Sequence, residues 1–303
     1  MNMQEPVSGA VLLAHLGVIR ARGPEATKFL QSQLTNDFAA MGPSEVRFAG
    51  FCSAKGRLQA SFVAWQAAPD DVLLACSASV LPATLKRLSM FVLRAQCKLS
   101  DASAEVSLRG LVGIAAERSM PAARDWEKRD VVGAALLRLP DAAGVARCIV
   151  ASTSVPEEGT EPAIPLDHWR WLEVQSGIPT IEAATIDRFV PQMINFELLG
   201  GVDFRKGCYP GQEVVARSEY RGTIKRRMFL FDCAAPAVAG QEIFHSADPG
   251  QPAGLVVNGA PGPTGAWSAL VEVKLAALEG GTLHLGSAEG APLRIGELPY
   301  PLS

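Results

Sequence analysis

The hydrophobic pattern of the chain changes once, near residue 220, and this change limits the folds that the chain can adopt. Before it, short strand-like runs alternate with amphipathic helices. Beyond about residue 223 only short apolar runs separated by proline and glycine occur: MFLFDC, QEIFHS, AGLVVNG, WSALVEVKL and GTLHLG. Such runs are typical of a small all-β domain. We therefore expect residues 1–220 to form an α+β region and residues 221–303 to form a C-terminal β-barrel.

Local patterns before this change indicate antiparallel strands packed against helices. Residues 17–23 alternate in polarity as a strand does, and Gly23-Pro24 then opens a helix with apolar residues at helical spacing. The runs VRFAGFCS and LQASFVAW flank Lys55-Gly56-Arg57 as the two arms of a hairpin. We expect a helix over residues 79–96 and a further strand over residues 104–116. This mixture predicts an α+β fold and not a doubly wound sheet.

A linker is predicted at residues 151–165, which are rich in serine, threonine, proline and acidic residues. The segment DHWRWLEVQSG that follows it predicts a helix that stops at Gly177 and Pro179. No G-x-G-x-x-G sequence and no P-loop occurs in the chain, so nucleotide binding through those motifs is not predicted.

Cysteine and histidine usage argues against a metal site and against a disulfide framework. The six cysteines are scattered without a C-x-x-C pair, and none of the four histidines lies close to a cysteine in the sequence. The first basic residue, Arg20, follows the N-terminal apolar stretch, which is the reverse of a signal peptide. No run approaches the length of a membrane span. We therefore expect a cytoplasmic protein that holds no metal and does not enter a membrane.

One cysteine, Cys208, stands in surroundings that favour a reactive thiol. Lys206 precedes it by two residues, and Gly207, Pro210 and Gly211 predict a tight exposed turn. A helix start follows the turn, and both a nearby cation and a helix N-terminus favour the thiolate. The alternative is that Cys208 is a small buried hydrophobe, as most lone cysteines are. The local sequence leaves both interpretations open.

Positive charge is concentrated around this turn, although the whole chain carries a net charge of -3. Residues 205–227 hold seven basic side chains against two acidic ones, a local balance of +5. The segment is either a solvated face or a docking surface for an anion such as a polyanionic tail, a phosphate or an RNA backbone. Under the second interpretation, neutralising Arg226 and Arg227 abolishes a salt-dependent interaction. The acidic net charge argues against stable, non-specific coating of nucleic acid.

The string KGCYPGQE, residues 206–213, resembles the K-G-C-Y-x-G-Q-E signature of the YgfZ-type folate-binding proteins, which are relatives of the glycine cleavage aminomethyltransferases. The segments before and after it, GIPTIEAATIDRFVPQMINFELLGGVDF and VARSEYRGTIKRR, also resemble that family. So do FLQSQLTND and CSAKGR near the start and ELPYPLS at the end. The resemblance therefore extends over nearly the whole chain.

The resemblance implies a ring of three subdomains around a central cleft that binds tetrahydrofolate or a one-carbon derivative of it. Two of these subdomains would be interleaved within residues 1–220. The family acts in one-carbon metabolism, in maintaining a subset of iron-sulfur enzymes and in the tRNA thiolation that depends on such enzymes. Iron-sulfur assembly proteins or client enzymes are the implied partners. The signature cysteine, here Cys208, is needed for function in that family, and we take Lys206 as its catalytic neighbour.

A folate site needs an aromatic plate, polar groups for the pterin edge and cations for the glutamate tail. Trp169 lies where the family has a folate-associated tryptophan; Trp171 is the alternative, and both could instead be core residues. Gln175 replaces a glutamate that pairs with the pterin in the transferases. The remaining candidate folate contacts come from the signature and the segment after it: Tyr209, Gln212, Glu213, Arg217 and Arg226.

Three functions remain open at this point. The first is a folate-binding accessory protein for iron-sulfur enzymes that works through Cys208. The second is a folate-dependent aminomethyl or methyl transferase. Against it, the resemblance aligns Gln59 and Ala60 with the strand positions where the transferases carry acidic residues, and an amide cannot exchange a proton near neutral pH. The third is a non-catalytic scaffold that binds a partner through the positive segment, for which Cys208 is dispensable.

Overall fold

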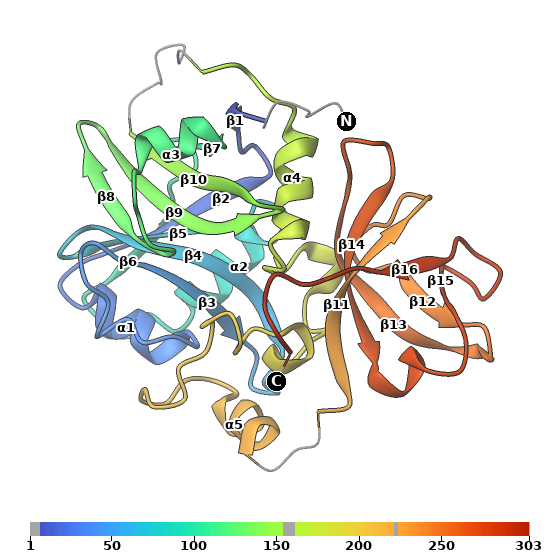
Figure 1. Ribbon diagram of the computed structural model, residues 1–303. Helices are drawn as coiled ribbons and strands as arrows, with labels where there is room; N and C mark the ends of the chain where they lie inside the picture. The colour runs from blue at the N-terminus through green and yellow to red at the C-terminus, as the bar shows by residue number, and fades with distance from the viewer. Residues whose placement is uncertain (1–6, 154–160, 221–223, 303) are drawn as a thin grey trace.

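The computed structural model describes residues 7–153, 161–220 and 224–302, which form three antiparallel sheets (Figure 1). The core of the predicted linker, residues 154–160, lies outside the described residues. So do residues 1–6 of the N-terminal stretch and Arg221 of the positive segment. None of the helices within the described ranges is long and apolar enough to cross a membrane.

The first sheet has the strand order β3-β4-β5-β2-β6, and the helices α1 and α2 cover one of its faces. Its elements are β2 (Leu16–Arg22), α1 (Ala26–Gln33), β3 (Val46–Cys52), β4 (Leu58–Ala68), β5 (Asp71–Ser77), α2 (Leu81–Ser89) and β6 (Lys98–Asp101). The predicted hairpin is present, because β3 and β4 pair in an antiparallel register.

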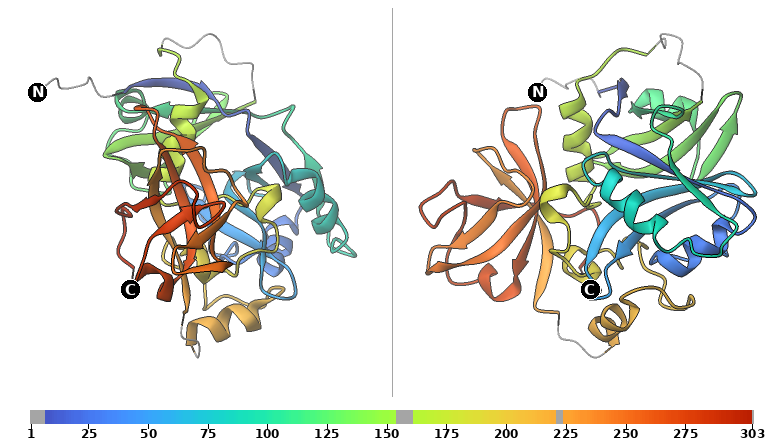
Figure 2. Two further views of the ribbon diagram at one scale, coloured as in Figure 1. Left: turned by 90° about the vertical axis from the view of Figure 1, so that its right-hand side faces the viewer. Right: turned by 180° about the vertical axis from the view of Figure 1, so that it is seen from behind.

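The second sheet has the order β1-β7-β10-β9-β8, so the chain leaves it after β1 and returns to it only with β7. Its elements are β1 (Gly9–Leu12), β7 (Ser107–Val112), α3 (Ile114–Ser119), β8 (Lys128–Val131), β9 (Ala134–Ala142) and β10 (Val145–Ser152). The helix α4 (Leu166–Gln175) then runs between this sheet and the third one (Figures 1 and 2).

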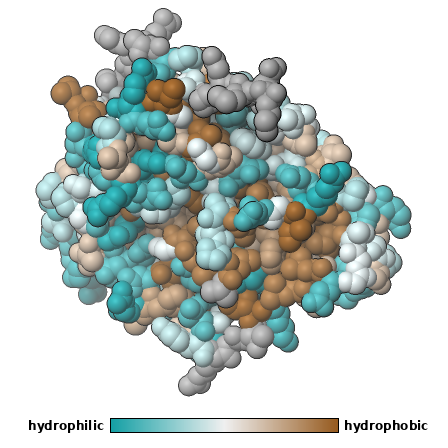
Figure 3. Space-filling model, viewed as in Figure 1, coloured by the Kyte–Doolittle hydropathy of each residue, from teal (hydrophilic) through white to brown (hydrophobic). Residues whose placement is uncertain are grey.

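The third sheet is the barrel-like unit at the C-terminus, with the order β15-β12-β13-β14-β11-β16. Its strands are β11 (Arg226–Cys233), β12 (Glu242–His245), β13 (Asp248–Pro261), β14 (Trp267–Lys274), β15 (Leu283–Leu285) and β16 (Leu293–Ile295). Four short helices complete the chain: η1 (Ala183–Thr185), η2 (Pro191–Ile194), α5 (Gln212–Tyr220) and η3 (Leu275–Leu278). In Figure 3 apolar residues gather over the part of the surface where the barrel strands lie. The α+β prediction with a C-terminal barrel is confirmed.

Two element predictions were wrong at their ends. The helix predicted over residues 79–96 stops at Ser89, after its last buried residue, Leu88, because Met90 and Leu93 are 66% and 85% exposed and offer no apolar stripe to pack. The strand predicted over residues 104–116 stops at Val112. Gly113 has φ 62°, which turns the chain into α3.

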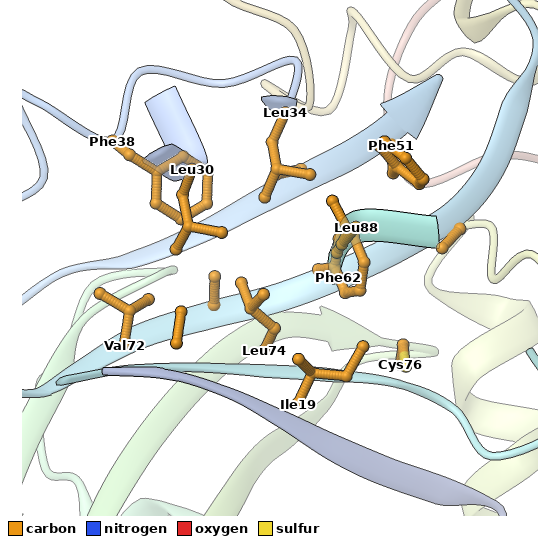
Figure 4. Packing of buried hydrophobic residues seen from close by; sticks show 14 of the residues in the cluster. Ile19, Leu30, Leu34, Phe38, Phe51, Phe62, Val72, Leu74, Cys76 and Leu88 are labelled. Atoms are coloured by element: carbon orange, nitrogen blue, oxygen red, sulfur yellow. The ribbon is translucent and has the colours of Figure 1, made fainter. Parts of the chain in front are cut away.

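The first sheet is buried on both faces because neighbouring residues on each strand point into different cores. Leu74 packs with α1 and α2 in the first core, shown in Figure 4, whereas Leu73 packs toward the second sheet. A third core joins β3, η2, α5 and the barrel, and it contains Phe48, Phe196 and Leu270. The three sheets therefore share apolar contacts around one centre.

Candidate functional site

Two adjoining cavities lie where the three sheets meet around α4. The outer cavity has a volume of about 280 Å³ and is lined by residues of the first sheet, of α4 and of β13. The inner cavity has a volume of about 50 Å³ and is lined by residues of the first sheet, the second sheet and α4. Glu173, Ile178 and Thr180 line both. We refer to the two together as the central cavity.

The two parts of the central cavity differ in polarity. The outer part is rich in polar side chains, which are His15, Ser77, Ser79, Arg170, Glu173, Thr180, Glu182 and Asn258. The inner part is mostly apolar and is lined among others by Phe48, Phe62, Val63, Trp126, Leu139 and Ile149, with Arg147 and Glu173 as its charged groups. Apolar walls with a few convergent polar groups are usual in sites for small organic ligands. The inner part alone, at about 50 Å³, is too small for such a ligand, so a ligand would have to occupy the outer part as well.

Glu173 is the acidic group at the junction of the two parts. The His15 Nε2 atom lies 3.1 Å and 3.0 Å from its two carboxylate oxygens, and the indole N–H of Trp169 donates to Oε1 at 2.8 Å. Desolvation by itself would raise the pKa of the Glu173 carboxyl. His15, the Trp169 indole and Arg147 outweigh it and lower that pKa below its usual value. The cavity therefore contains a carboxylate that is ionised at neutral pH.

Arg147 supplies the matching buried cation. Its side chain is 1% exposed, its Nε and Nη2 atoms each donate to the Pro140 carbonyl at 3.1 Å, and its guanidinium lies 5.7 Å from the Trp169 ring centroid. Desolvation lowers the pKa of Arg147 to about 10, so the side chain remains protonated at neutral pH. The inner cavity thus presents charges of both signs beside an apolar wall.

The structure places Trp169 behind the wall of the central cavity and not in it. Trp169 is 0% exposed and packs so closely on β7 that a Cβ at Gly110 would lie 2.4 Å from its ring. The tryptophan that lines the inner cavity is Trp126, which stacks on Phe48 with ring centroids 5.8 Å apart. Sequence reasoning missed Trp126 because it lies outside every motif.

The other two tetrahydrofolate candidates on α4 face the barrel. The Trp171 indole N–H donates to the Ser268 hydroxyl at 3.2 Å, and the Gln175 amide donates to the same hydroxyl at 2.9 Å. Neither residue lines the central cavity. Glu173 was not among the candidates, although it is an acidic residue two positions from Gln175. Its position on the cavity side of α4 is visible only in the structure.

The signature residues form a second region in which three distant segments meet. The loop of residues 203–211 packs against the turn of the β3–β4 hairpin, because a Cβ at Gly211 would lie 2.4 Å from the Ser53 carbonyl. Lys206 reaches the C-terminal end of α1, where its ammonium donates to the carbonyls of Gln31 at 2.6 Å and Asn36 at 2.9 Å, and also to that of Leu34. These are the segments FLQSQLTND, CSAKGR and KGCYPGQE.

Cys208 is exposed at the outer side of this loop, whereas Cys52, Cys76, Cys148 and Cys233 are buried. Desolvation raises the pKa of Cys52, of Cys76 and of Cys148 to about 12. These buried thiols are therefore un-ionised at neutral pH. The reactivity of Cys208 and the catalytic role of Lys206 stay predictions.

The remaining candidates lie apart from the central cavity. Tyr209 is buried, with its ring 5.2 Å from the Lys206 ammonium, and desolvation raises its pKa. Gln212 and Glu213 begin α5, and Glu213 pairs with Arg217 at 2.6 Å on the exposed helix surface. Arg226 pairs with Glu272. None of these five lines the central cavity.

The positive segment is less available as a docking surface than its composition indicated. The Arg227 guanidinium is buried in an ion pair with Glu197, and the Arg226 guanidinium pairs with the buried Glu272. Lys206 is also buried. Exposed cations remain at Arg205, Arg217 and Lys225. A docking test that neutralises Arg226 and Arg227 would therefore also break internal ion pairs.

The positions predicted to replace the transferase carboxylates do not line the central cavity either. The Gln59 amide donates to the Asp187 carboxylate at 3.1 Å, and Ala60 is fully buried in the first core. Within the described ranges, no group of three histidine, cysteine or acidic residues is arranged to hold a metal ion.

Comparison with known proteins connects this geometry to a family. The chain is 32% identical over 235 residues to the tRNA-modifying protein YgfZ of Edwardsiella ictaluri, covering 70% of this chain and 67% of that protein. It is 30% identical over 240 residues to the tRNA-modifying protein YgfZ of Colwellia psychrerythraea, covering 76% and 73%. No protein-family model matches the chain.

Among solved structures, the glycine cleavage system aminomethyltransferase T of Bartonella henselae has a similar fold. The TM-score is 0.71 at 16% sequence identity, and the likeness covers 97% of this chain and 86% of that one. The three sheets around the central cavity are therefore the arrangement of an aminomethyltransferase fold.

Proposed function

Because the chain belongs to the YgfZ family, we propose that it binds tetrahydrofolate in the central cavity and supports iron-sulfur enzymes that act in tRNA modification, with Cys208 as its working thiol. The names of the relatives, tRNA-modifying proteins, support the link to tRNA modification. The aminomethyltransferase fold, which is a folate-binding fold, supports the ligand.

The observation that carries the proposal is the pairing of an ionised carboxylate with an apolar chamber. A pterin ring presents two faces that suit apolar contact and an edge that carries N–H donors. Glu173 offers charge-assisted acceptors for such an edge, and Trp126 and Phe48 offer apolar and aromatic surface. Arg147 and Arg170 are the cations that line the cavity.

These residues fit the ligand class better than those predicted from the motif. The predicted cations Arg217 and Arg226 are paired elsewhere, whereas Arg170 lies in the outer cavity with its Nη2 atom 3.7 Å from Glu182. We therefore assign the anionic glutamate tail of the ligand to the outer cavity. The bound folate would supply the one-carbon chemistry, and this chain would bind it, orient it and keep Glu173 ionised beside it.

The test separates ligand binding from thiol function. Glu173→Gln removes the charged acceptor at nearly constant shape and should weaken tetrahydrofolate binding at least tenfold, measured by calorimetry. Cys208→Ser should bind within about threefold of the parent, yet should fail to restore iron-sulfur enzyme activity in cells that lack the native protein, because a hydroxyl is un-ionised near neutral pH.

Three results would contradict the proposal, each in a different way. Unchanged affinity in Glu173→Gln would remove the central cavity as the folate site. Full restoration by Cys208→Ser would make the thiol incidental and would favour the scaffold interpretation. Release of formaldehyde from an aminomethyl donor in a tetrahydrofolate-dependent reaction would instead favour a transferase.

A further inference from the structure

The Lys206 ammonium has three N–H donors, and three backbone carbonyls accept from them at the end of α1. These carbonyls belong to the last turn of the helix and the residues after it, which lack intrahelical partners. Lys206 therefore closes the C-terminal end of a helix that lies about 170 residues earlier in the chain.

The residues before Lys206 are attached to the same segment. The Asp203 N–H donates to the Thr35 carbonyl at 3.0 Å, and the Thr35 hydroxyl donates to the Gly201 carbonyl. The Asp203 carboxylate in turn accepts the backbone N–H groups of Arg205 at 2.7 Å and Lys206 at 3.1 Å. The chain from residue 201 to residue 206 is thus fastened to residues 31–36 immediately before Cys208.

Gly207 and Cys208, the two residues after Lys206, are not attached to α1 in this way. A Cβ at Gly207 would meet no atom within 4 Å, and Gly207 and Cys208 are both exposed. The loop is fixed again at Tyr209, whose side chain is buried with its ring 5.2 Å from the Lys206 ammonium, and then at Gly211, which lies against the turn of the β3–β4 hairpin. Cys208 therefore lies on a short exposed segment between two anchored residues, one of which is Lys206.

We propose that Lys206 is a positioning residue that holds the Cys208 loop on the end of α1, and that it does not act as a charge that activates the thiol. The inference rests on the proposed function only in taking Cys208 as the working group. Its structural part concerns the loop and is measurable without any activity.

The two roles of Lys206 predict opposite results. In Lys206→Met the three carbonyls lose their donors, so hydrogen exchange of the hydrogen-bonded backbone amides of Asp203, Arg205 and Lys206 should become at least tenfold faster. Alkylation of Cys208 by iodoacetamide at pH 7.5 should not slow, because the thiol is already exposed. A charge that stabilised the thiolate would instead leave exchange unchanged and make alkylation several-fold slower in this variant.

Matched variants separate the hydrogen-bonding role of Lys206 from a general effect of positive charge. Lys206→Arg keeps a cation with several donors, and although its larger planar guanidinium matches the three carbonyls less well, it should retain more exchange protection than Lys206→Met. Lys55→Met removes an exposed cation from the adjacent hairpin turn and should change neither exchange nor the rescue of iron-sulfur enzymes. Lys206→Met should lose that rescue, and Lys206→Arg should keep most of it.

If Lys206→Met does not fold, Lys206→Gln is measured instead. Its shorter side chain ends in an amide with two N–H donors, so this variant should lose part of the protection from hydrogen exchange. Equal exchange in the parent and in every Lys206 variant would overturn the inference. Carrying out the exchange measurement also in Cys208→Ser keeps the result independent of the proposed thiol function.

Discussion

At the scale of single residues, the structure gives the candidate side chains roles that differ from those their motifs indicated. Lys206 is buried and serves three carbonyls, and Trp169 supports Glu173 from behind the cavity wall. Cys208, by contrast, keeps the exposure that its turn predicted. The residues next to a candidate reactive group in the sequence are therefore not always its partners in space.

The first prediction concerns the pH dependence that Lys206 contributes to stability. Desolvation lowers its pKa to about 8 from 10.5, against the opposing effect of Asp37 and Asp203. Between these values the unfolded chain binds more protons than the folded one, so the free energy of unfolding due to Lys206 rises with pH. The slope is at most about 1.4 kcal/mol per pH unit.

Urea unfolding of the parent and of Lys206→Met between pH 7 and pH 10.5 measures this effect as a difference, in which other titrating groups largely cancel. The stability of the parent relative to Lys206→Met should be lowest near neutral pH and should increase above about pH 8. A difference that decreases over this range would contradict the assigned direction of the pKa shift.

The second prediction separates Trp126, which is partly buried, from Trp169, which is fully buried, by fluorescence. Trp126→Phe should remove the largest share of the quenching caused by tetrahydrofolate, because Trp126 lines the inner cavity. Trp169→Phe should keep that share but weaken binding roughly tenfold, since the N–H donor to the Glu173 carboxylate is lost. Loss of most quenching in Trp169→Phe, with none in Trp126→Phe, would restore Trp169 as the aromatic plate.

At the scale of elements, the position of α4 determines the central cavity. The helix is pressed against β7 at Gly110, and its first and last residues contact the second sheet and the barrel, respectively. Gly177 ends it with φ 67°, and the Tyr300 ring packs there while its hydroxyl donates to the Gly177 carbonyl at 2.8 Å. Small shifts of α4 would therefore move Glu173.

The third prediction tests this contact. Gly110→Ala would place a methyl group 2.4 Å from the Trp169 ring, so the variant should lose about 1–3 kcal/mol of stability by overpacking. It should also bind tetrahydrofolate more weakly, as Trp169 carries the hydrogen bond to Glu173. Gly250→Ala is the control, because a Cβ there meets no atom within 4 Å. Equal stability of the two variants would contradict the tight contact.

At the scale of the whole molecule, the predicted boundary between residues 220 and 221 does not separate the apolar cores. The third core contains residues of β3 and η2 together with residues of β11 and β14. A buried ion pair between Arg227 and Glu197 crosses the same boundary, with side chains that are 7% and 6% exposed. We therefore propose that the α+β region and the barrel fold as one cooperative unit.

The fourth prediction follows from this shared core. Urea unfolding of the parent should show a single transition by both fluorescence and circular dichroism. Arg227→Met should lower stability by about 3–5 kcal/mol, because it leaves the Glu197 carboxylate buried without its partner. Lys225→Met, which neutralises an exposed cation two residues away, is the control. Two separate transitions in the parent would show that the regions fold independently.

The sequence by itself determined the fold class, the family and the exposed turn at Cys208. It could do so because strand alternation, helix periodicity and turn chemistry are set by residues within a few positions of each other. The signature KGCYPGQE is likewise a contiguous string. The two wrong ends have different causes: the helix stops where exposed residues leave no apolar stripe to pack, and the strand stops where Gly113 turns the chain into α3.

Only the tertiary structure decided which side chains meet. His15 and Glu173 are 158 residues apart, and Lys206 lies 175 residues from Gln31, so no local pattern connects either pair. Arg226 and Arg227 have the charge of a docking surface, yet the buried carboxylates of Glu272 and Glu197 pair with them. Such contacts depend on how three sheets pack around α4, because the burial of distant apolar faces, and not local propensity, brings these polar groups within hydrogen-bonding distance.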